Sequence, residues 1–153
     1  MGAAYLVWAA VGTTWLLGLV GMAQPQFFSG GVTVCYLIGI AGCLGAFAPI
    51  PVFLEKEIES RQLLITIFLQ GLALVVLFAS IYRGYGFPNA ADHLYVTDAV
   101  YFSAVTWTTL GYGDLTPPRD LRLLAALEAL VGYIFLGLGI GLGVNVLSRR
   151  QEP

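Results

Sequence analysis

No charged residue occurs in the first 54 residues of this chain. A helix that crosses a lipid bilayer needs only about 20 apolar residues, so this stretch is long enough for two crossings and must turn back between them. Proline, glycine and polar side chains at 24–26 and 29–31 favour that turn. We therefore predict an N-terminal transmembrane helical hairpin over 1–54, with crossings near 3–23 and 32–50.

The composition of the whole chain supports a membrane protein. Its 153 residues are 58% hydrophobic and 10% charged. An ordinary soluble domain is about 25% charged. Because backbone polar groups must be paired within a membrane-spanning segment, long apolar stretches of this length form helices. The predicted fold class is an all-α membrane protein in contact with membrane lipids, and no nucleic-acid partner is expected.

The second half of the chain contains two further apolar stretches. A charged linker at 55–61 separates the hairpin from an uncharged segment that predicts an outer helix over 62–82. The segment 121–148 contains Glu128 as its only charged residue after the first turn and predicts an inner helix. Together with the hairpin, these helices make four transmembrane crossings, followed by a short tail at 149–153.

An even number of crossings places both chain ends on one side of the membrane. Basic residues are more frequent on the cytoplasmic side of a membrane. Here the side that holds both chain ends has one basic residue more than the opposite side. The residues compared are Lys56, Arg61, Arg149 and Arg150 against Arg83, Arg119 and Arg122. The predicted protein is therefore a multi-pass cell-membrane protein with cytoplasmic termini.

Between the outer and inner helices, residues 109–113 form a glycine-rich loop at membrane depth. Non-helical backbone is tolerated there only if it is buried in protein or lines a watery path. Gly111 and Gly113 can adopt positive φ angles, which lets successive carbonyl groups point the same way while Leu110 and Tyr112 point back into protein. A carbonyl ladder from one chain cannot surround an ion, so several copies must meet around an axis.

The run from Tyr101 to Asp114, YFSAVTWTTLGYGD, resembles the pore helix and selectivity filter of the potassium channel superfamily. The similarity extends over 62–148 and is closest to the prokaryotic-type pore domain, which has two helices and one pore loop. It implies a re-entrant pore helix over 98–108, a filter over 109–113 and a four-fold symmetric homotetramer. In that family, backbone carbonyls replace the hydration shell of the ion. Here they would be those of Thr109, Leu110, Gly111 and Tyr112, with the Thr109 hydroxyl at the inner end and Gly113 completing the filter.

Three residues beside the filter are candidate supports. In similar channels the acid that follows the filter forms a hydrogen bond behind it. By that resemblance, Asp114 would pair with the Tyr101 hydroxyl, and Thr108 would also support the filter. A solvated carboxylate at the channel mouth is the alternative for Asp114.

Two residues of the predicted inner helix have alternative interpretations. Gly132 lies where inner helices of similar channels often bend, so it is a possible gating hinge, but small residues also allow close helix packing. Glu128 is the only ionisable residue inside a predicted crossing. It could form hydrogen bonds around the pore helix or extend to the membrane interface. We expect structural support rather than contact with the permeant ion.

The resulting function is a potassium-selective ion channel, which carries passive K+ flux through a tetrameric carbonyl-lined filter and is placed in a prokaryotic inner membrane. A weakly selective cation channel is one alternative, and a non-conducting or ion-transporter subunit that assembles with other chains is another. An enzyme would need clustered ionisable side chains at membrane depth, so none is expected. No cofactor is expected, since K+ is the permeant ion.

Overall fold

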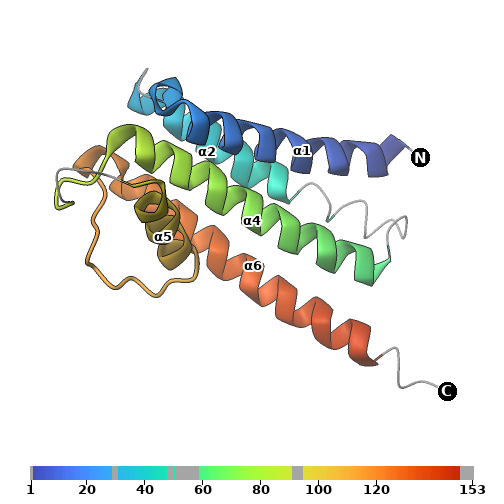
Figure 1. The fold of residues 1–153 in the computed structure, drawn as a ribbon. Helices are drawn as coiled ribbons and strands as arrows, with labels where there is room; N and C mark the ends of the chain where they lie inside the picture. The colour runs from blue at the N-terminus through green and yellow to red at the C-terminus, as the bar shows by residue number, and fades with distance from the viewer. Residues whose placement is uncertain (1, 29–30, 48–49, 51–58, 91–94, 149–153) are drawn as a thin grey trace.

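The computed structural model describes residues 2–28, 31–47, 50, 59–90 and 95–148, and this part of the chain contains helices and no strand. Five α-helices and two short 3-10 turns follow one another along it (Figure 1). Their bounds are α1 Gly2–Ala23, η1 Pro25–Phe28, α2 Val32–Ala46, α4 Ser60–Tyr85, α5 Val96–Trp107, η2 Arg119–Leu121 and α6 Arg122–Ser148.

The four longer helices lie side by side, and the short helix α5 lies at one end of them (Figure 1). The start of α1 and the end of α6 are both at the opposite end. Among the described residues, two helices are long and apolar enough to cross a membrane, Arg61–Tyr85 and Arg119–Ser148. The apolar segments Trp8–Ala23 and Val32–Ala46 are shorter. The described part of the chain is therefore helical, and its two candidate membrane-spanning helices lie after residue 60.

The helices of the second half lie close to the expected positions. The range 62–82, expected as an outer helix, falls within α4, and the range 121–148, expected as an inner helix, covers the last residue of η2 and all of α6. The assignment of these helices to a pore domain stays a prediction. The short helix expected over 98–108 is α5. Residues 48–49 of the second crossing expected over 32–50, and residues 55–58 of the charged linker at 55–61, lie outside the described residues. The tail at 149–153 also lies outside them.

Local signals explain where α4 ends and where α5 begins. Helix α4 stops at Gly86, which has a φ of 72° and donates its N–H to the Tyr82 carbonyl at 2.8 Å. Glycine adopts that backbone angle without steric cost. At the start of α5, the Asp98 carboxylate accepts the free Tyr95 N–H at 2.9 Å. Such a cap satisfies an N–H that has no partner within the helix.

Helix α4 is the centre of the bundle and packs against α1, α2, α5 and α6. Its large apolar side chains with no exposed surface are Leu74, Leu77, Phe78, Ile81 and Tyr82. The hairpin approaches α4 through glycines. A Cβ atom at Gly21 would lie 2.7 Å from the Ser80 hydroxyl, and one at Gly42 would lie 2.8 Å from a Leu77 methyl carbon. Close approach of this kind is how small residues bring apolar helices together.

Polar contacts also fasten the hairpin to the second half of the chain. The Gln70 amide of α4 donates to the Thr14 hydroxyl of α1 at 3.1 Å, in the buried interior. Arg83 donates to the Met22 carbonyl at the far end of the same helix pair. On α2, the Tyr36 hydroxyl donates to the Asp120 carbonyl at 2.9 Å. The hairpin is therefore attached to both the outer helix and the turn that precedes the inner helix.

Candidate functional site

The glycine-rich loop begins where α5 ends and has a distinctive backbone. Positive φ angles occur at every second residue, 60° at Thr109, 54° at Gly111 and 78° at Gly113. Alternation of left-handed and right-handed backbone turns successive N–H groups to one side and successive carbonyls to the other. The two glycines have the angles expected from the sequence. The positive φ of Thr109 could not be expected from the sequence, because a β-branched residue rarely adopts such an angle. That backbone conformation costs of order 1–3 kcal/mol.

The first part of the loop is anchored to the end of α5 through its N–H groups. Thr109 donates to the Thr106 carbonyl at 3.0 Å, and Leu110 and Gly111 donate to the Val105 carbonyl at 3.0 and 3.4 Å. Among hydrogen bonds between described residues, none ends on a carbonyl oxygen of residues 109–112. The loop therefore presents a row of backbone oxygens that are free to bind a ligand.

The side chains that precede the two glycines are exposed in the single chain. Leu110 is 60% exposed and Tyr112 is 67% exposed, so the expectation that both are buried behind the loop of an assembled channel stays a prediction. Tyr112 lies parallel to Tyr101, with ring centroids 6.4 Å apart and planes inclined by 3°. The chain supplies a single short helix behind the loop, which covers the Tyr112 ring on one face and leaves Leu110 exposed.

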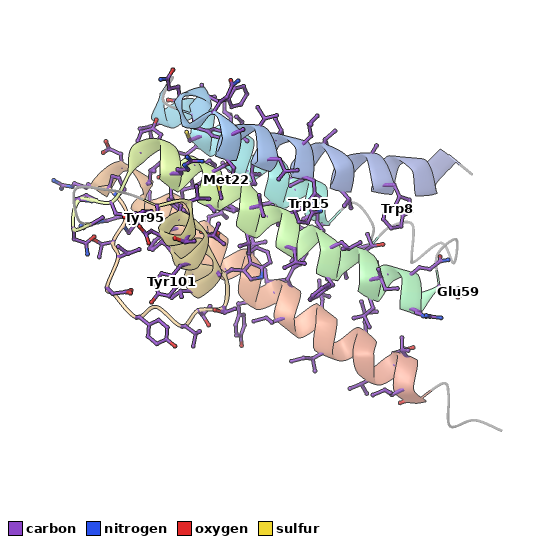
Figure 2. All side chains as sticks on the ribbon, viewed as in Figure 1. Trp8, Trp15, Met22, Glu59, Tyr95 and Tyr101 are labelled. Carbon is purple, nitrogen blue, oxygen red and sulfur yellow. The ribbon has the colours of Figure 1, made fainter. Side chains whose placement is uncertain are left out.

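A hydrogen-bonded network holds the far end of the loop. Tyr101, on α5 at the end of the bundle that carries the loop (Figure 2), donates to the Asp114 carboxylate at 2.7 Å. Asn89, in the turn after α4, donates to the Asp114 carbonyl at 2.7 Å. The Asn89 amide oxygen accepts the Thr116 N–H at 2.9 Å and the Thr116 hydroxyl at 3.0 Å. Asn89 was not among the residues predicted from the sequence.

This network sets the acid–base behaviour of Asp114. The hydrogen bond from Tyr101 lowers the pKa of the Asp114 carboxyl below its ordinary value, and the N–H of Leu115 acts in the same direction. The same hydrogen bond raises the pKa of the Tyr101 hydroxyl. Asp114 is therefore a carboxylate at neutral pH and, although exposed, is paired rather than freely solvated.

The remaining predicted site residues lie at the base of the loop. Thr108 directs its hydroxyl to the Ala104 carbonyl at 2.7 Å, and so closes the last turn of α5. Gly132 of α6 lies against the end of the same helix, where an added Cβ would be 2.1 Å from the Trp107 carbonyl oxygen. The structure thus gives Gly132 a packing role, while its role as a gating hinge stays a prediction.

Glu128 is fully buried and accepts a hydrogen bond from the Tyr82 hydroxyl at 2.8 Å. It also lies against Ser103 of α5 at 2.5 Å. Of the two expectations for this residue, hydrogen bonding around the short helix is therefore confirmed and extension to the interface is wrong. Nothing in the sequence indicated Tyr82 or Ser103 as its partners.

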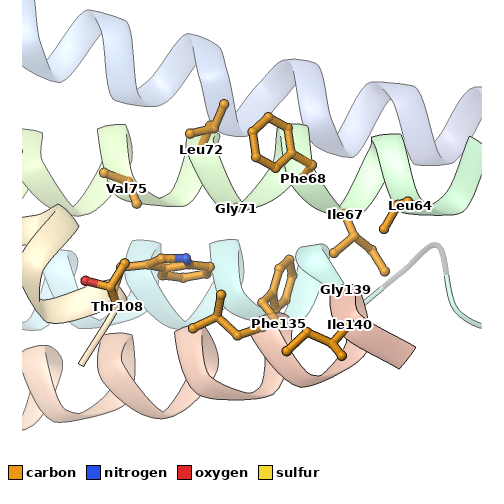
Figure 3. A pocket seen from close by; sticks show the side chains of 12 residues that line it. Leu64, Ile67, Phe68, Gly71, Leu72, Val75, Thr108, Phe135, Gly139 and Ile140 are labelled. Carbon is orange, nitrogen blue, oxygen red and sulfur yellow. The ribbon is translucent and has the colours of Figure 1, made fainter. Parts of the chain in front are cut away.

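A cavity of about 480 Å³ lies beside the base of the loop, between α4 and α6 (Figure 3). Its walls are apolar apart from Thr108, and they include Phe68, Phe135 and Ile140. A cavity without ionisable groups cannot supply acid–base or nucleophilic catalysis. The chemical capacity of the site therefore resides in the backbone oxygens of the loop.

Comparison with known proteins assigns the second half of the chain. Residues 71–149 match the ion channel family. Two pore potassium channel b of Oryza sativa subsp. japonica is 38% identical over 73 residues, which cover 43% of this chain and 21% of that protein. Two-pore potassium channel 1 of Arabidopsis thaliana is 41% identical over 58 residues, covering 37% and 16%. Potassium voltage-gated channel subfamily KQT member 4 of Homo sapiens is 40% identical over 83 residues, covering 52% and 12%.

The chain belongs to the ion channel family, and the relatives named above that it resembles are potassium channels. It is a membrane channel protein rather than an enzyme. It spans about a fifth of the length of the first of these relatives and less of the other two. No solved structure matches it.

Proposed function

We propose that this protein is a potassium-selective channel in which four copies of residues 109–113 surround the ion path. The observation that carries the proposal is the alternation of positive φ at Thr109, Gly111 and Gly113, beside carbonyl oxygens that no described residue binds. Such a row of oxygens can replace the hydration shell of K+. The proposed ligands are the carbonyls of residues 109–112, with the Thr109 hydroxyl at the inner end.

The position of α5 favours a cation at this loop. The C-terminal end of a helix carries about half a negative charge, and the loop follows directly on the end of α5 at Trp107. The acidic side chain at the other end of the loop is Asp114, which the hydrogen bond from Tyr101 keeps ionised. Both features attract a positively charged ion and repel an anion.

Two features support a tetramer, the single row of carbonyls in the loop and the exposed apolar side chains on α6. One chain cannot enclose an ion with a single row of carbonyls, and closed rotational symmetry supplies the missing rows. Large apolar side chains on α6 are exposed in the single chain and available for contact with further copies. They include Leu130, Tyr133, Ile134, Ile140 and Val144.

The proposed topology has four crossings per subunit, α1, α2, α4 and α6, with cytoplasmic termini in a prokaryotic inner membrane. It is supported by the long helices running side by side and by the described ends of the chain lying at the end of the bundle remote from α5. In this arrangement α5 and the loop lie toward the outer side. K+ would move passively down its electrochemical gradient.

A reversal-potential measurement tests the proposal. The purified protein is reconstituted in planar bilayers with K+ on one side and Na+ on the other. We expect a reversal near the K+ equilibrium potential. A reversal near zero would instead identify a weakly selective cation channel. Silence from a protein that has inserted as a tetramer would favour a non-conducting or transporter subunit that needs another chain.

A further inference from the structure

Glu128 joins three helices at one buried point. Its carboxyl group, with no exposed surface, is on α6. One oxygen accepts the Tyr82 hydroxyl of α4 at 2.8 Å, and the other lies 2.5 Å from the Ser103 hydroxyl oxygen of α5. A carboxyl group at membrane depth is costly unless its partners satisfy it, so its place here requires both neighbours.

A second contact between the same two helices lies one helical turn further on. Gly132 follows Glu128 by four residues, and Trp107 follows Ser103 by four. A Cβ atom at Gly132 would lie 2.1 Å from the Trp107 carbonyl oxygen and 2.9 Å from its carbonyl carbon. Residues four apart lie on the same helix face. Helices α5 and α6 therefore contact each other at two successive turns, through a hydrogen bond at Glu128 and through close packing at Gly132. Trp107 is the last residue of α5, and the filter loop follows directly.

The number of hydrogen-bond donors and acceptors around Ser103 limits how Glu128 and Ser103 can be bonded. The Ser103 hydroxyl oxygen lies 2.5 Å from Glu128 and 2.9 Å from the Val75 carbonyl oxygen. A hydroxyl group has one proton and can donate only once at a time. If the Glu128 carboxyl group carries a proton and donates to Ser103, then Ser103 donates to Val75 and Tyr82 donates to Glu128. In this arrangement the Tyr82 and Ser103 hydroxyl groups, the Glu128 carboxyl group and the Val75 carbonyl all have hydrogen-bond partners. Glu128 must supply a donor to Ser103 and an acceptor to Tyr82, and a glutamine side chain can supply both.

We propose that Glu128 is a positioning residue for the filter, which holds α5 in register with α6 through Ser103 while Gly132 sets their separation at Trp107. The inference rests on the proposed function, because the geometry that it maintains is that of the K+-binding loop. A rotation or axial shift of α6 breaks the Glu128 contact or displaces the Trp107 carbonyl, and either change moves the residue from which the filter starts. The inner helix thereby controls the filter without touching the ion.

The test compares variants of the full chain as reconstituted tetramers. The readouts are the Na+ to K+ permeability ratio and the extra thermal stability that K+ confers over Na+. We expect E128Q to stay within about twofold of the wild-type permeability ratio, because its amide still offers an N–H to Ser103 and a carbonyl oxygen to Tyr82. E128A should raise that ratio about tenfold and remove most of the K+-specific stabilisation. L123A is the control for truncation on the same helix, since Leu123 is 75% exposed.

Two further variants decide the question if E128A does not assemble. S103A removes the hydrogen bond to the pore helix, and Y82F removes the one to the outer helix, so each costs Glu128 one partner. We expect S103A to raise the permeability ratio and Y82F to lower overall stability equally in K+ and Na+. Equal effects of S103A and Y82F on the permeability ratio, or wild-type selectivity in S103A, would overturn the positioning role. Absence of K+-selective conduction in the wild-type tetramer would contradict the proposed function itself, and this proposal with it.

Discussion

Tyr101 and Asp114 are joined by a hydrogen bond of 2.7 Å that connects the middle of α5 to the residue after the proposed filter, residues 109–113. The loop is therefore held at both ends by the helix that precedes it, since Thr109 and Leu110 also donate to carbonyls of α5. This double attachment leaves the backbone between those ends little freedom. It fits a loop whose carbonyl positions must be reproducible.

Gly113→Ala is expected to abolish K+ conduction while membrane insertion is retained. Gly113 has a φ of 78°, so an added Cβ strains the backbone even though the space around it is open. Gly12→Ala is the matched control, because Gly12 is helical and has nothing within 4 Å of the added carbon. K+ flux into proteoliposomes measures both variants. Normal flux from Gly113→Ala would contradict the filter assignment.

Tyr101→Phe is expected to make the outer end of the loop more sensitive to acid. The hydrogen bond from Tyr101 lowers the pKa of Asp114 from an ordinary value of 3.8. Its stabilising contribution is therefore complete above that value and is lost as the pH falls through the lowered pKa. Without the hydroxyl group the pKa of Asp114 returns toward 3.8, so the carboxylate that holds this end of the loop becomes protonated at a higher pH.

The acid sensitivity is measured as K+ flux against pH for Tyr101→Phe and for Tyr95→Phe. The second variant removes the hydroxyl group of an exposed tyrosine at the start of the same helix. Only Tyr101→Phe should shift the acid limb to higher pH. Identical acid limbs in Tyr101→Phe and the wild type would show that the hydrogen bond does not protect the loop.

Asn89→Ala is expected to loosen the residues that follow the filter. It removes the bond to the Asp114 carbonyl and both bonds from Thr116. Each is worth about 0.5–1.5 kcal/mol when buried and less at this exposed site. The expected result is a shorter lifetime of the conducting state in single-channel records.

Asn89→Asp provides a graded comparison. The carboxylate can still accept from Thr116 but cannot donate to the Asp114 carbonyl, so its effect should be intermediate unless the added negative charge dominates. Raising the salt concentration screens that charge and separates the two contributions. A conducting-state lifetime in Asn89→Ala equal to that of the wild type would exclude Asn89 as a support of the loop.

Gly21→Ala is expected to destabilise the packing of the hairpin on the pore segment. The added Cβ would lie 2.1 Å from a ring carbon of Phe28 and 2.7 Å from the Ser80 hydroxyl. Overpacking of this kind typically costs about 1–3 kcal/mol. Thermal unfolding in detergent should show a lower midpoint for Gly21→Ala than for the wild type and an unchanged midpoint for Gly12→Ala. Unchanged unfolding of Gly21→Ala would mean that α1 does not pack on α4 as described.

The sequence allowed prediction of those features that depend on local chemistry. Positive φ at Gly111 and Gly113 follows from the freedom of glycine, and the uncharged stretches predicted long helices close to α4 and α6. Positive φ at Thr109 could not be predicted in this way. Nothing in the local preference of threonine favours it, so the surrounding hydrogen bonds must impose it.

The partners in the buried and outer networks could not be predicted for a different reason. Tyr82 is 46 residues from Glu128, and Asn89 is 25 residues from Asp114. A lone asparagine in a turn and a tyrosine on an apolar helix carry no pattern of their own. Their roles depend on which helix faces lie together, which is decided by packing over the whole bundle.

The close packing of the hairpin on α4 changes which substitutions the outer helix can accept. Lipid acyl chains adapt to apolar side chains of almost any shape, whereas a protein surface already packed around glycines does not. Leu77 of α4 meets Gly18 through its backbone and Gly42 through its methyl group. At such positions, exchange of one apolar residue for another of different shape is constrained as strongly as in the core of a soluble protein, although every residue involved satisfies the hydropathy of a membrane span.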